Sequence, residues 1–317
     1  MNKVLVSTVV VLVLALFSVE AHAGKKIGIL MFSEETRYIE AEKGIRDKLR
    51  QAGFGEPQTT FIVGQAGGNK ARAAELVGKL AAEKLNLIVT LGTSATVVVC
   101  KEIKDVPIVF SMVYDPVEAG IAKDWKSSGN NTTGSSAKIP MSRLMEILKN
   151  FEQVKRLAVL YTPGEKNSES QLRDLQRIQT DYRIKILPVP LTEVEEIGQL
   201  FSEVLRTVEA VYVTGSNVVN SQVSNIVNMA TKAKVITITH LDDLSEKGIL
   251  LGVCPDSYSL GQLAGEKAIK ILRGEKPSSI PIEPAKRFHA ILNTKTARKG
   301  QFEIPIEVAK ILTRTIE

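Results

Sequence analysis

Residues 85–116 place the tightest limit on the fold of this chain. Two apolar runs rich in β-branched residues, 87–91 and 107–113, flank a segment of helical length. This order predicts a strand, a helix and a second strand parallel to the first. Parallel strands are covered by helices on both faces, so we expect an α/β fold.

Polar residues follow each of these two strands. Thr93 and Ser94 come after the first, and Tyr114 and Asp115 come after the second. Ligands of open α/β sheets bind beyond the carboxyl ends of the strands. We therefore expect hydroxyls, free helix N–H groups and a carboxylate to meet at one edge of the sheet.

The rest of the chain repeats this alternation. It has 317 residues, 44% of them hydrophobic, which is enough for about two domains. The turn-rich residues 126–136 favour a crossing between lobes over a packed element. Ser168 with Gln171, and Thr192 with Glu195, have the capping-box spacing and predict that helices begin there.

Residues 1–23 have the features of a secretory signal peptide. Lys3 precedes an apolar run at 4–17, and Ala21 and Ala23 supply a cleavage site. The alternative is a membrane anchor, but the run is shorter than the ~20 apolar residues that a spanning helix needs. We expect cleavage after Ala23 and a periplasmic location.

Charge and cysteine usage exclude other classes. The net charge is +6, but the basic residues alternate with acidic ones along the expected helices, so no nucleic-acid partner is predicted. Cys100, Cys254 and three scattered histidines have no metal-ligand spacing, and no cofactor is expected. Whether the two cysteines form a disulfide stays open.

Several motifs together resemble one family. They are GILMF, VTLGTSAT, VPIVF followed by YDPVEAG, GNNTTGSS, VKRLAVLYTPGEKNS and GVCPDSYSLGQLAGEKAIKILRGEKPSSIPIE. The chain is similar in these stretches, and in their order, to ABC-transporter substrate-binding proteins of the tryptophan/tyrosine-binding type. It departs from the pattern at Ser33-Glu34-Glu35 and at Cys254-Pro255, which bears on the identity of the ligand.

The resemblance implies a type I periplasmic-binding-protein fold. Two Rossmann-like lobes with parallel sheets are joined by a hinge of three crossings, and they close on a small ligand that passes to a permease in the inner membrane. We expect one lobe to comprise residues 24–136 plus 256–280. The other lobe would comprise 137–255 plus 281–317.

Within that fold, the candidate site residues suit an amino-acid-like ligand. The helix start at Thr93-Ser94-Ala95 would bind a carboxylate, and Asn167-Ser168 begins the equivalent helix on the second lobe. Asp115 or Asp256 would receive an ammonium group. Each of these residues has an ordinary alternative role as a helix cap or a turn residue.

Rings at strand ends extend the predicted site. Phe32, Tyr114 and Tyr161 would form a wall for an apolar or aromatic side chain, or else merely close the core. The full candidate set is Phe32, Ser33, Thr93, Ser94, Ala95, Tyr114, Asp115, Ser136, Tyr161, Asn167, Ser168, Ser216, Asn217 and Asp256.

Enzyme chemistry has little support in the sequence. The chain has no G-x-S-x-G, G-x-x-x-x-G-K-[ST], H-E-x-x-H or early G-x-G-x-x-G motif. Asp115, His240 and Ser94 could form a hydrolytic set only if the fold brought them together, and His240 is better explained as a structural residue. The sequence thus predicts a monomeric solute-binding component of an ABC importer. The alternatives are a sensor that docks on a chemoreceptor or kinase and, more remotely, a periplasmic enzyme.

Overall fold

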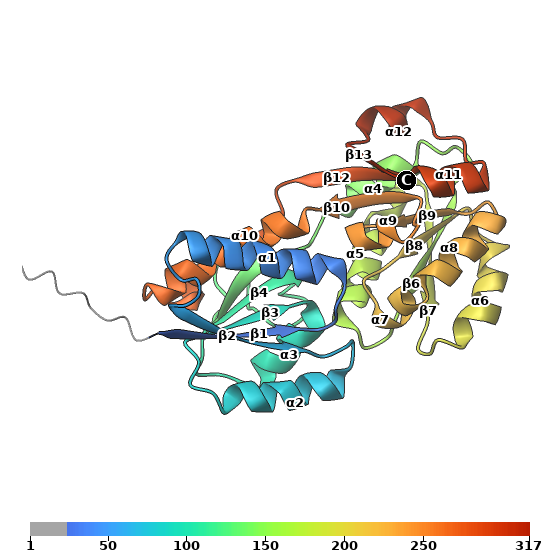
Figure 1. The fold of residues 1–317 in the computed structure, drawn as a ribbon. Coiled ribbons are helices and arrows are strands. Elements are labelled where there is room, and N and C mark those ends of the chain that lie inside the picture. The colour runs from blue at the N-terminus through green and yellow to red at the C-terminus, as the bar shows by residue number, and fades with distance from the viewer. Residues whose placement is uncertain (1–23) are drawn as a thin grey trace, which may run out of the picture.

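The computed structural model describes residues 24–317, so the signal-peptide prediction lies outside the described residues. The chain forms two α/β lobes (Figure 1). In the part that is described, no helix combines the length and the apolar character needed to cross a bilayer.

The first lobe is built on a six-stranded parallel sheet, in the order β11-β5-β4-β3-β1-β2. Its strands are β1 (Lys25–Met31), β2 (Thr59–Gln65), β3 (Leu87–Leu91), β4 (Ile108–Val113), β5 (Thr132–Ser136) and β11 (Glu283–Pro284). Its helices are α1 (Thr36–Gln51), α2 (Lys70–Ala81), α3 (Thr93–Glu102), α10 (Ser257–Leu272) and the short η1 (Pro277–Ser279). Helices α1 and α10 cover one face of this sheet, while α2 and α3 cover the other (Figure 1).

The second lobe has a seven-stranded sheet, in the order β13-β12-β10-β9-β8-β6-β7. Its strands are β6 (Arg156–Tyr161), β7 (Lys185–Pro190), β8 (Ala210–Val213), β9 (Ile236–Thr239), β10 (Leu251–Pro255), β12 (Phe288–Asn293) and β13 (Arg314–Ile316). All its pairs are parallel except β10 with β12. Its helices are α4 (Met141–Leu148), α5 (Lys166–Tyr182), α6 (Glu196–Leu205), α7 (Asn217–Ser221), α8 (Val223–Lys232), α9 (Asp242–Glu246), α11 (Thr294–Gly300) and α12 (Ile306–Ile311).

Burial follows the pattern expected for parallel sheets. Every residue of β3 and β4 is buried. In β6, Leu157 and Val159 belong to one hydrophobic core, while Ala158 and Leu160 belong to another. Successive side chains on a strand point to opposite faces, so the second sheet has a core on each side. The predicted strand–helix–strand unit and the two-lobed α/β fold are confirmed.

The glycine between β3 and α3 is required by its surroundings. Gly92 has φ +96°, and a Cβ there would lie 2.7 Å from the hydroxyl oxygen of Tyr38. Only glycine adopts this conformation easily and leaves that space free. The tight turn brings the N-terminus of α3 to the edge of the sheet that faces the second lobe.

Three crossings join the lobes, after β5, after β10 and after β11. The expected crossing at 126–136 is wrong in its second half, because Thr132–Ser136 is the buried strand β5 between β4 and β11. Strand prediction from apolar runs misses β5 because four of its five residues are Thr or Ser. Residues 283–284 pair with β5, so they lie in the first lobe and not, as expected, in the second.

Both capping-box predictions are also wrong. Helix α5 begins at Lys166, and the Ser168 hydroxyl donates to the carbonyl oxygens of Thr162 and Glu165. Helix α6 begins at Glu196, whose carboxylate accepts the Thr192 N–H at 2.7 Å. At α6 a glutamate carboxylate therefore does accept an N–H group before the helix, but the glutamate is Glu196 and not Glu195 as the motif predicts.

The two cysteines are free thiols and belong to different lobes. Cys100 lies on α3 of the first lobe, and Cys254 lies in β10 of the second. Burial raises the pKa of Cys100 to about 12 and also raises that of Cys254. Neither thiol is therefore activated as a nucleophile.

Candidate functional site

A small cavity lies between the two lobes. The first lobe lines it with Arg37, Tyr38, Thr93, Met112 and Tyr114, the crossing adds Ala137, and the second lobe adds Asn167, Gln171, Gly215, His240 and Leu241. Its free volume is about 20 Å³, which is room for about one water molecule. The lobes are therefore closed on each other, and they must separate before a larger molecule can enter.

Three of the predicted site residues line this cavity: Thr93, Tyr114 and Asn167. Thr93 is the first residue of α3, and its hydroxyl oxygen accepts the Tyr114 N–H at 3.3 Å. The first N–H groups of a helix have no partner within the helix. The cavity wall therefore includes the positive end of α3, where a carboxylate would be stabilised.

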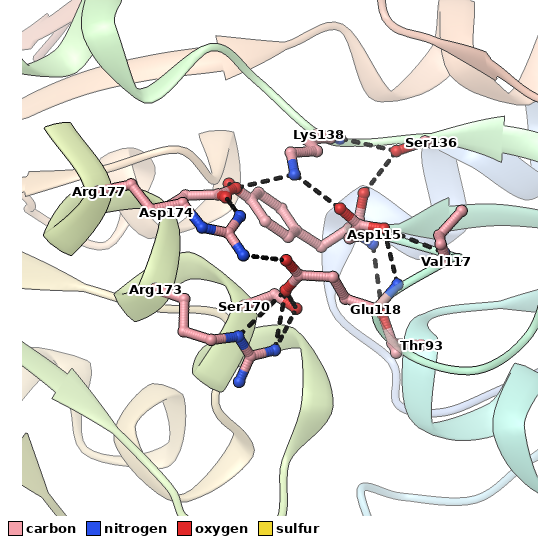
Figure 2. A network of polar contacts seen from close by, with 11 residues as sticks. Thr93, Asp115, Val117, Glu118, Ser136, Lys138, Ser170, Arg173, Asp174 and Arg177 are labelled. Carbon is pink, nitrogen blue, oxygen red and sulfur yellow. Dashed lines mark hydrogen bonds and ion pairs between the residues drawn. The ribbon is translucent and has the colours of Figure 1, made fainter. Parts of the chain in front are cut away.

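Asp115 does not line the cavity, and its carboxylate is engaged within the chain (Figure 2). Oδ2 lies 2.6 Å from Lys138 Nζ, and Oδ1 accepts the N–H groups of Val117 and Glu118 at 3.0 Å. Lys138 Nζ also lies 3.0 Å from Asp174 Oδ2, to which the Tyr114 hydroxyl donates. Asp115 thus forms a turn, which was the alternative role considered for it, and also an ion pair with Lys138, which was not expected.

Asp256 is likewise used by the chain. Its Oδ1 accepts the Ser259 N–H at 2.6 Å and caps α10. The residue lines a separate hollow, beside Lys48, Glu266 and Arg287. The structure therefore does not bring the two predicted ammonium partners to the interlobe cavity.

The remaining candidates do not line the cavity. Phe32 belongs to the core of the first lobe, and Tyr161 packs against a core of the second. Ser136 donates to the Tyr114 carbonyl oxygen, Ser216 caps α7, and Asn217 donates to Glu165. Ser33 is buried, Ser94 and Ala95 continue the first turn of α3, and Ser168 bonds within its own turn.

His240 lines the cavity, although its position after a strand was interpreted from the sequence as that of a structural residue. It follows β9 and is 1% exposed. Its Nδ1 lies 2.7 Å from the Tyr212 hydroxyl, and its Nε2 lies 3.3 Å from Gln171 Nε2. The edge of its ring meets the Tyr114 ring, with 5.5 Å between centroids.

The hydrogen bonds determine the protonation state of this histidine. Gln171 Oε1 accepts the Gly215 N–H, so the amide nitrogen of Gln171 faces His240. An amide nitrogen only donates, so His240 Nε2 accepts and the ring proton is on Nδ1. Burial lowers the pKa of His240 to about 3, so the ring is neutral and serves as a wall.

Arg37 is a cavity residue that the sequence analysis did not predict. It lies in the first turn of α1 and is 3% exposed. Nη1 lies 2.6 Å from Asp243 Oδ2 on α9 of the other lobe, and Nη2 lies 3.4 Å from Glu35 Oε1. The rule about strand ends could have found it, because α1 begins five residues after β1 ends.

A second set of charges joins the lobes outside the cavity (Figure 2). Glu118, from the loop after β4, accepts hydrogen bonds from Ser170, Arg173 and Arg177 on α5 at 2.7–3.2 Å. Burial alone would raise the pKa of Glu118, but these hydrogen bonds lower it to about 2. Glu118 therefore stays ionised and holds the lobes together at neutral pH.

The comparisons with known proteins agree with this architecture. The family model described as ABC transporter substrate binding protein matches residues 26–316. A tyrosine-binding protein of Clostridioides difficile is 26% identical over 276 residues, which cover 86% of this chain and 80% of that protein.

Two solved structures also inform the arrangement of the lobes. An ABC domain from Streptococcus pneumonia in complex with L-Trp is 26% identical, with a TM-score of 0.87 over 92% of this chain and 100% of that one. The ligand-free, open structure of the substrate-binding protein CD0873 from Clostridium difficile is also 26% identical over the same shares, but its TM-score is 0.72. The lobes here are thus placed more as in the tryptophan complex than as in the open structure.

Two lobes around a closed cavity, wall residues drawn from both, and a family match over nearly the whole described chain point to one class. The fold and the family are those of solute-binding proteins and not of enzymes. The chain belongs to the ABC transporter substrate-binding protein family.

Proposed function

We propose that this protein binds an amino acid with an aromatic side chain in the interlobe cavity and delivers it, outside the cytoplasm, to an ABC permease. The observation that carries the proposal is the pairing, in one closed cavity, of a helix N-terminus with a set of rings. Thr93 begins α3, and Tyr38, Tyr114 and His240 line the same space. Two similar proteins are described as binding tyrosine and L-Trp, which supports the same ligand class here.

Each part of such a ligand has a partner in the cavity. The carboxylate would accept the free N–H groups at Thr93, Ser94 and Ala95, next to the guanidinium of Arg37. The side chain would lie against Tyr114 and His240, whose neutral ring presents an aromatic surface without a charge. The lobes would open to admit the ligand and close to remove it from water.

Isothermal titration calorimetry with a panel of solutes tests the ligand class. The panel contains L-Trp, L-Tyr, L-Phe, L-Leu and the polyol myo-inositol, since more distant structures of this fold hold polyols. We expect the aromatic amino acids to bind most tightly. Binding of the polyol alone, or of none of the five, would overturn the proposal.

The permease partner needs a separate test. Stimulation of the ATPase of the cognate permease in proteoliposomes, dependent on both the ligand and this protein, is the expected result. A ligand-bound protein that stimulates no transporter but is retained by a chemoreceptor or kinase ectodomain would instead support the sensor. Gel filtration of the protein from Gly24 onwards tests the expected monomer.

A further inference from the structure

We propose that the second lobe selects ligands which donate a hydrogen bond to Asn167 Oδ1, and that the main chain of Gly215 imposes this polarity. The proposal rests on the proposed function, because the ligand group that would donate is the α-ammonium of an amino acid. Asn167 was expected to help bind a carboxylate. Its geometry indicates the opposite role.

Gly215 holds two side-chain amides at once. Asn167 Nδ2 donates to the Gly215 carbonyl oxygen at 2.6 Å, and the Gly215 N–H donates to Gln171 Oε1 at 2.9 Å. A Cβ on residue 215 would lie 2.9 Å from Asn167 Nδ2, so a larger residue would push that amide away. The glycine therefore serves as a clamp for both side chains.

These two hydrogen bonds to Gly215 determine which atom of each side-chain amide stays free to bond elsewhere. Turning the Asn167 amide around would set its oxygen against the carbonyl oxygen of Gly215, and two acceptors cannot bond. Asn167 is thereby left with a free oxygen. Gln171 is left with its nitrogen, which faces the accepting Nε2 of His240.

The free oxygen of Asn167 is buried. Within residues 24–317, six residues have a buried side-chain nitrogen or oxygen without a hydrogen-bond partner, and of these Asn167 alone lines the cavity. Glu35 and Asp243 are in the same group, but neither lines the cavity, and each is paired with Arg37 through its other oxygen. A buried acceptor without a donor is unfavourable, so a ligand that supplies one gains affinity.

The two walls of the cavity therefore differ in polarity. The first lobe presents donors, which are the Arg37 guanidinium and the N-terminus of α3. The second lobe presents the Asn167 acceptor. This polarity matches a zwitterion with its carboxylate toward the first lobe and its ammonium toward the second, held between lobes that lie further apart than a cavity of about 20 Å³ leaves them.

The test compares L-Trp with indole-3-propionate, which has the same ring and carboxylate but no ammonium. We expect wild-type protein to prefer L-Trp by about tenfold to a hundredfold, as for a hydrogen bond between charged and buried groups. Asn167→Leu removes the acceptor, so it should lower the affinity for L-Trp by a similar factor. It should change the affinity for indole-3-propionate by less than about threefold, so the variant should bind the two ligands with nearly equal affinity.

Asn220→Leu is the matched control. Asn220 is also a buried asparagine without partners for its side-chain amide, and it lies on α7 of the same lobe, but it does not line the cavity. Its substitution should leave the preference unchanged. Gly215→Ala is a second variant that displaces the Asn167 amide without removing it, and it should lower the preference by several-fold.

The outcomes separate the two proposals. Wild-type protein that binds none of the aromatic amino acids would overturn the proposed function and this inference together. Wild-type protein that binds L-Trp while folded Asn167→Leu and Gly215→Ala keep its preference would overturn the inference alone. L-Tyr with 3-(4-hydroxyphenyl)propionate replaces the indole pair if tyrosine binds more tightly. Thermal unfolding verifies that each variant is folded.

Discussion

The guanidinium of Arg37 and the carboxylate of Asp243 meet across the two lobes, with 2.6 Å between Nη1 and Oδ2 and both side chains almost fully buried. Arg37 comes from the helix after the first strand, and Asp243 comes from the helix after β9. A buried pair adds little net stability when compared with apolar residues, but removing one partner leaves the other charge buried and uncompensated. The ion pair therefore forms only when the lobes are closed, and it favours the closed arrangement of the lobes.

Asp243→Asn should shift the ligand-free protein toward an open form. The substitution leaves the Arg37 charge with Glu35 alone at 3.4 Å, which favours exposure of the guanidinium to water. Small-angle X-ray scattering should show a larger radius of gyration than for wild-type protein. Glu246→Gln breaks the exposed Arg314 pair within the second lobe and should leave the radius unchanged. Equal radii for Asp243→Asn and wild type would contradict the prediction.

The Glu118 contact should make closure sensitive to acid but insensitive to pH near neutrality. The pKa of Glu118 is lowered to about 2, so its contribution is full above the ordinary pKa of about 4.5 and is lost as the pH falls toward 2. The radius of gyration should therefore stay constant between about pH 5 and pH 8. Glu118→Gln should be more open than wild type throughout that range. A Glu118→Gln radius equal to that of wild type across this range would argue against this assignment.

The fold was predictable from the sequence because its strands are apolar runs at regular spacing. Strand β5 (TTGSS) was not predicted because its buried side chains are hydroxyls. These hydroxyls donate to carbonyl oxygens far along the chain, Ser135 to Leu260 and Thr133 to Ile280. Such partners have no local signal. Sequence reasoning therefore finds buried apolar strands more readily than buried polar ones.

The site was predictable only in part, for a related reason. Tyr114 directly follows β4 and Thr93 comes two residues after β3 ends, so the rule about carboxyl ends of strands found both. Arg37 pairs with Asp243 of the other lobe, while Gln171 and His240 contact each other and His240 contacts Tyr212 within the second lobe, and none of these contacts has a local signal in the sequence. For Asp115, the strand-end position was read as ligand contact, but Lys138 comes close enough to neutralise it.

Asp242→Asn should stabilise the protein more at neutral than at acid pH. Burial and the neighbouring Asp243 raise the pKa of Asp242 to about 6, so its contribution to stability is lost as the pH rises from 3.8 to 6. At about 1.4 kcal/mol per pH unit, the loss is on the order of 3 kcal/mol. Urea unfolding at about pH 3.5 and pH 7.5 should show that the free energy of unfolding of the variant, relative to that of wild type, is larger at the higher pH.

Asp124→Asn supplies a control of opposite sign. Hydrogen bonds from the N–H groups of Ser127 and Lys126 lower the pKa of Asp124. That variant should therefore lose stability relative to wild type as the pH rises. The same pH trend in both variants would rule out this explanation.

Gly261→Ala should destabilise the first lobe. A Cβ at residue 261 of α10 would lie 2.0 Å from the carbonyl oxygen of Ala41 in α1, so the helices would have to move apart. Overpacking of this kind costs about 1–3 kcal/mol. In contrast, Gly78→Ala on α2 meets nothing within 4 Å and should stabilise the protein by about 0.5–1 kcal/mol. Chemical denaturation of both variants measures the difference, and a neutral Gly261→Ala would show that the two helices can separate freely.

The packing of α10 against α1 also bears on synthesis of the protein. When the ribosome has reached Asp256, the first lobe still lacks α10 and β11, and the second lobe still lacks β12 and β13. The sheet edges and the face of α1 that these elements cover are exposed in every shorter nascent chain. The first lobe is complete only when β11 has been made, and the second lobe only when β12 and β13 have followed, so neither lobe is finished before residue 284. A stop codon between Asp256 and Glu283 would therefore leave two incomplete cores rather than one intact lobe and one damaged lobe.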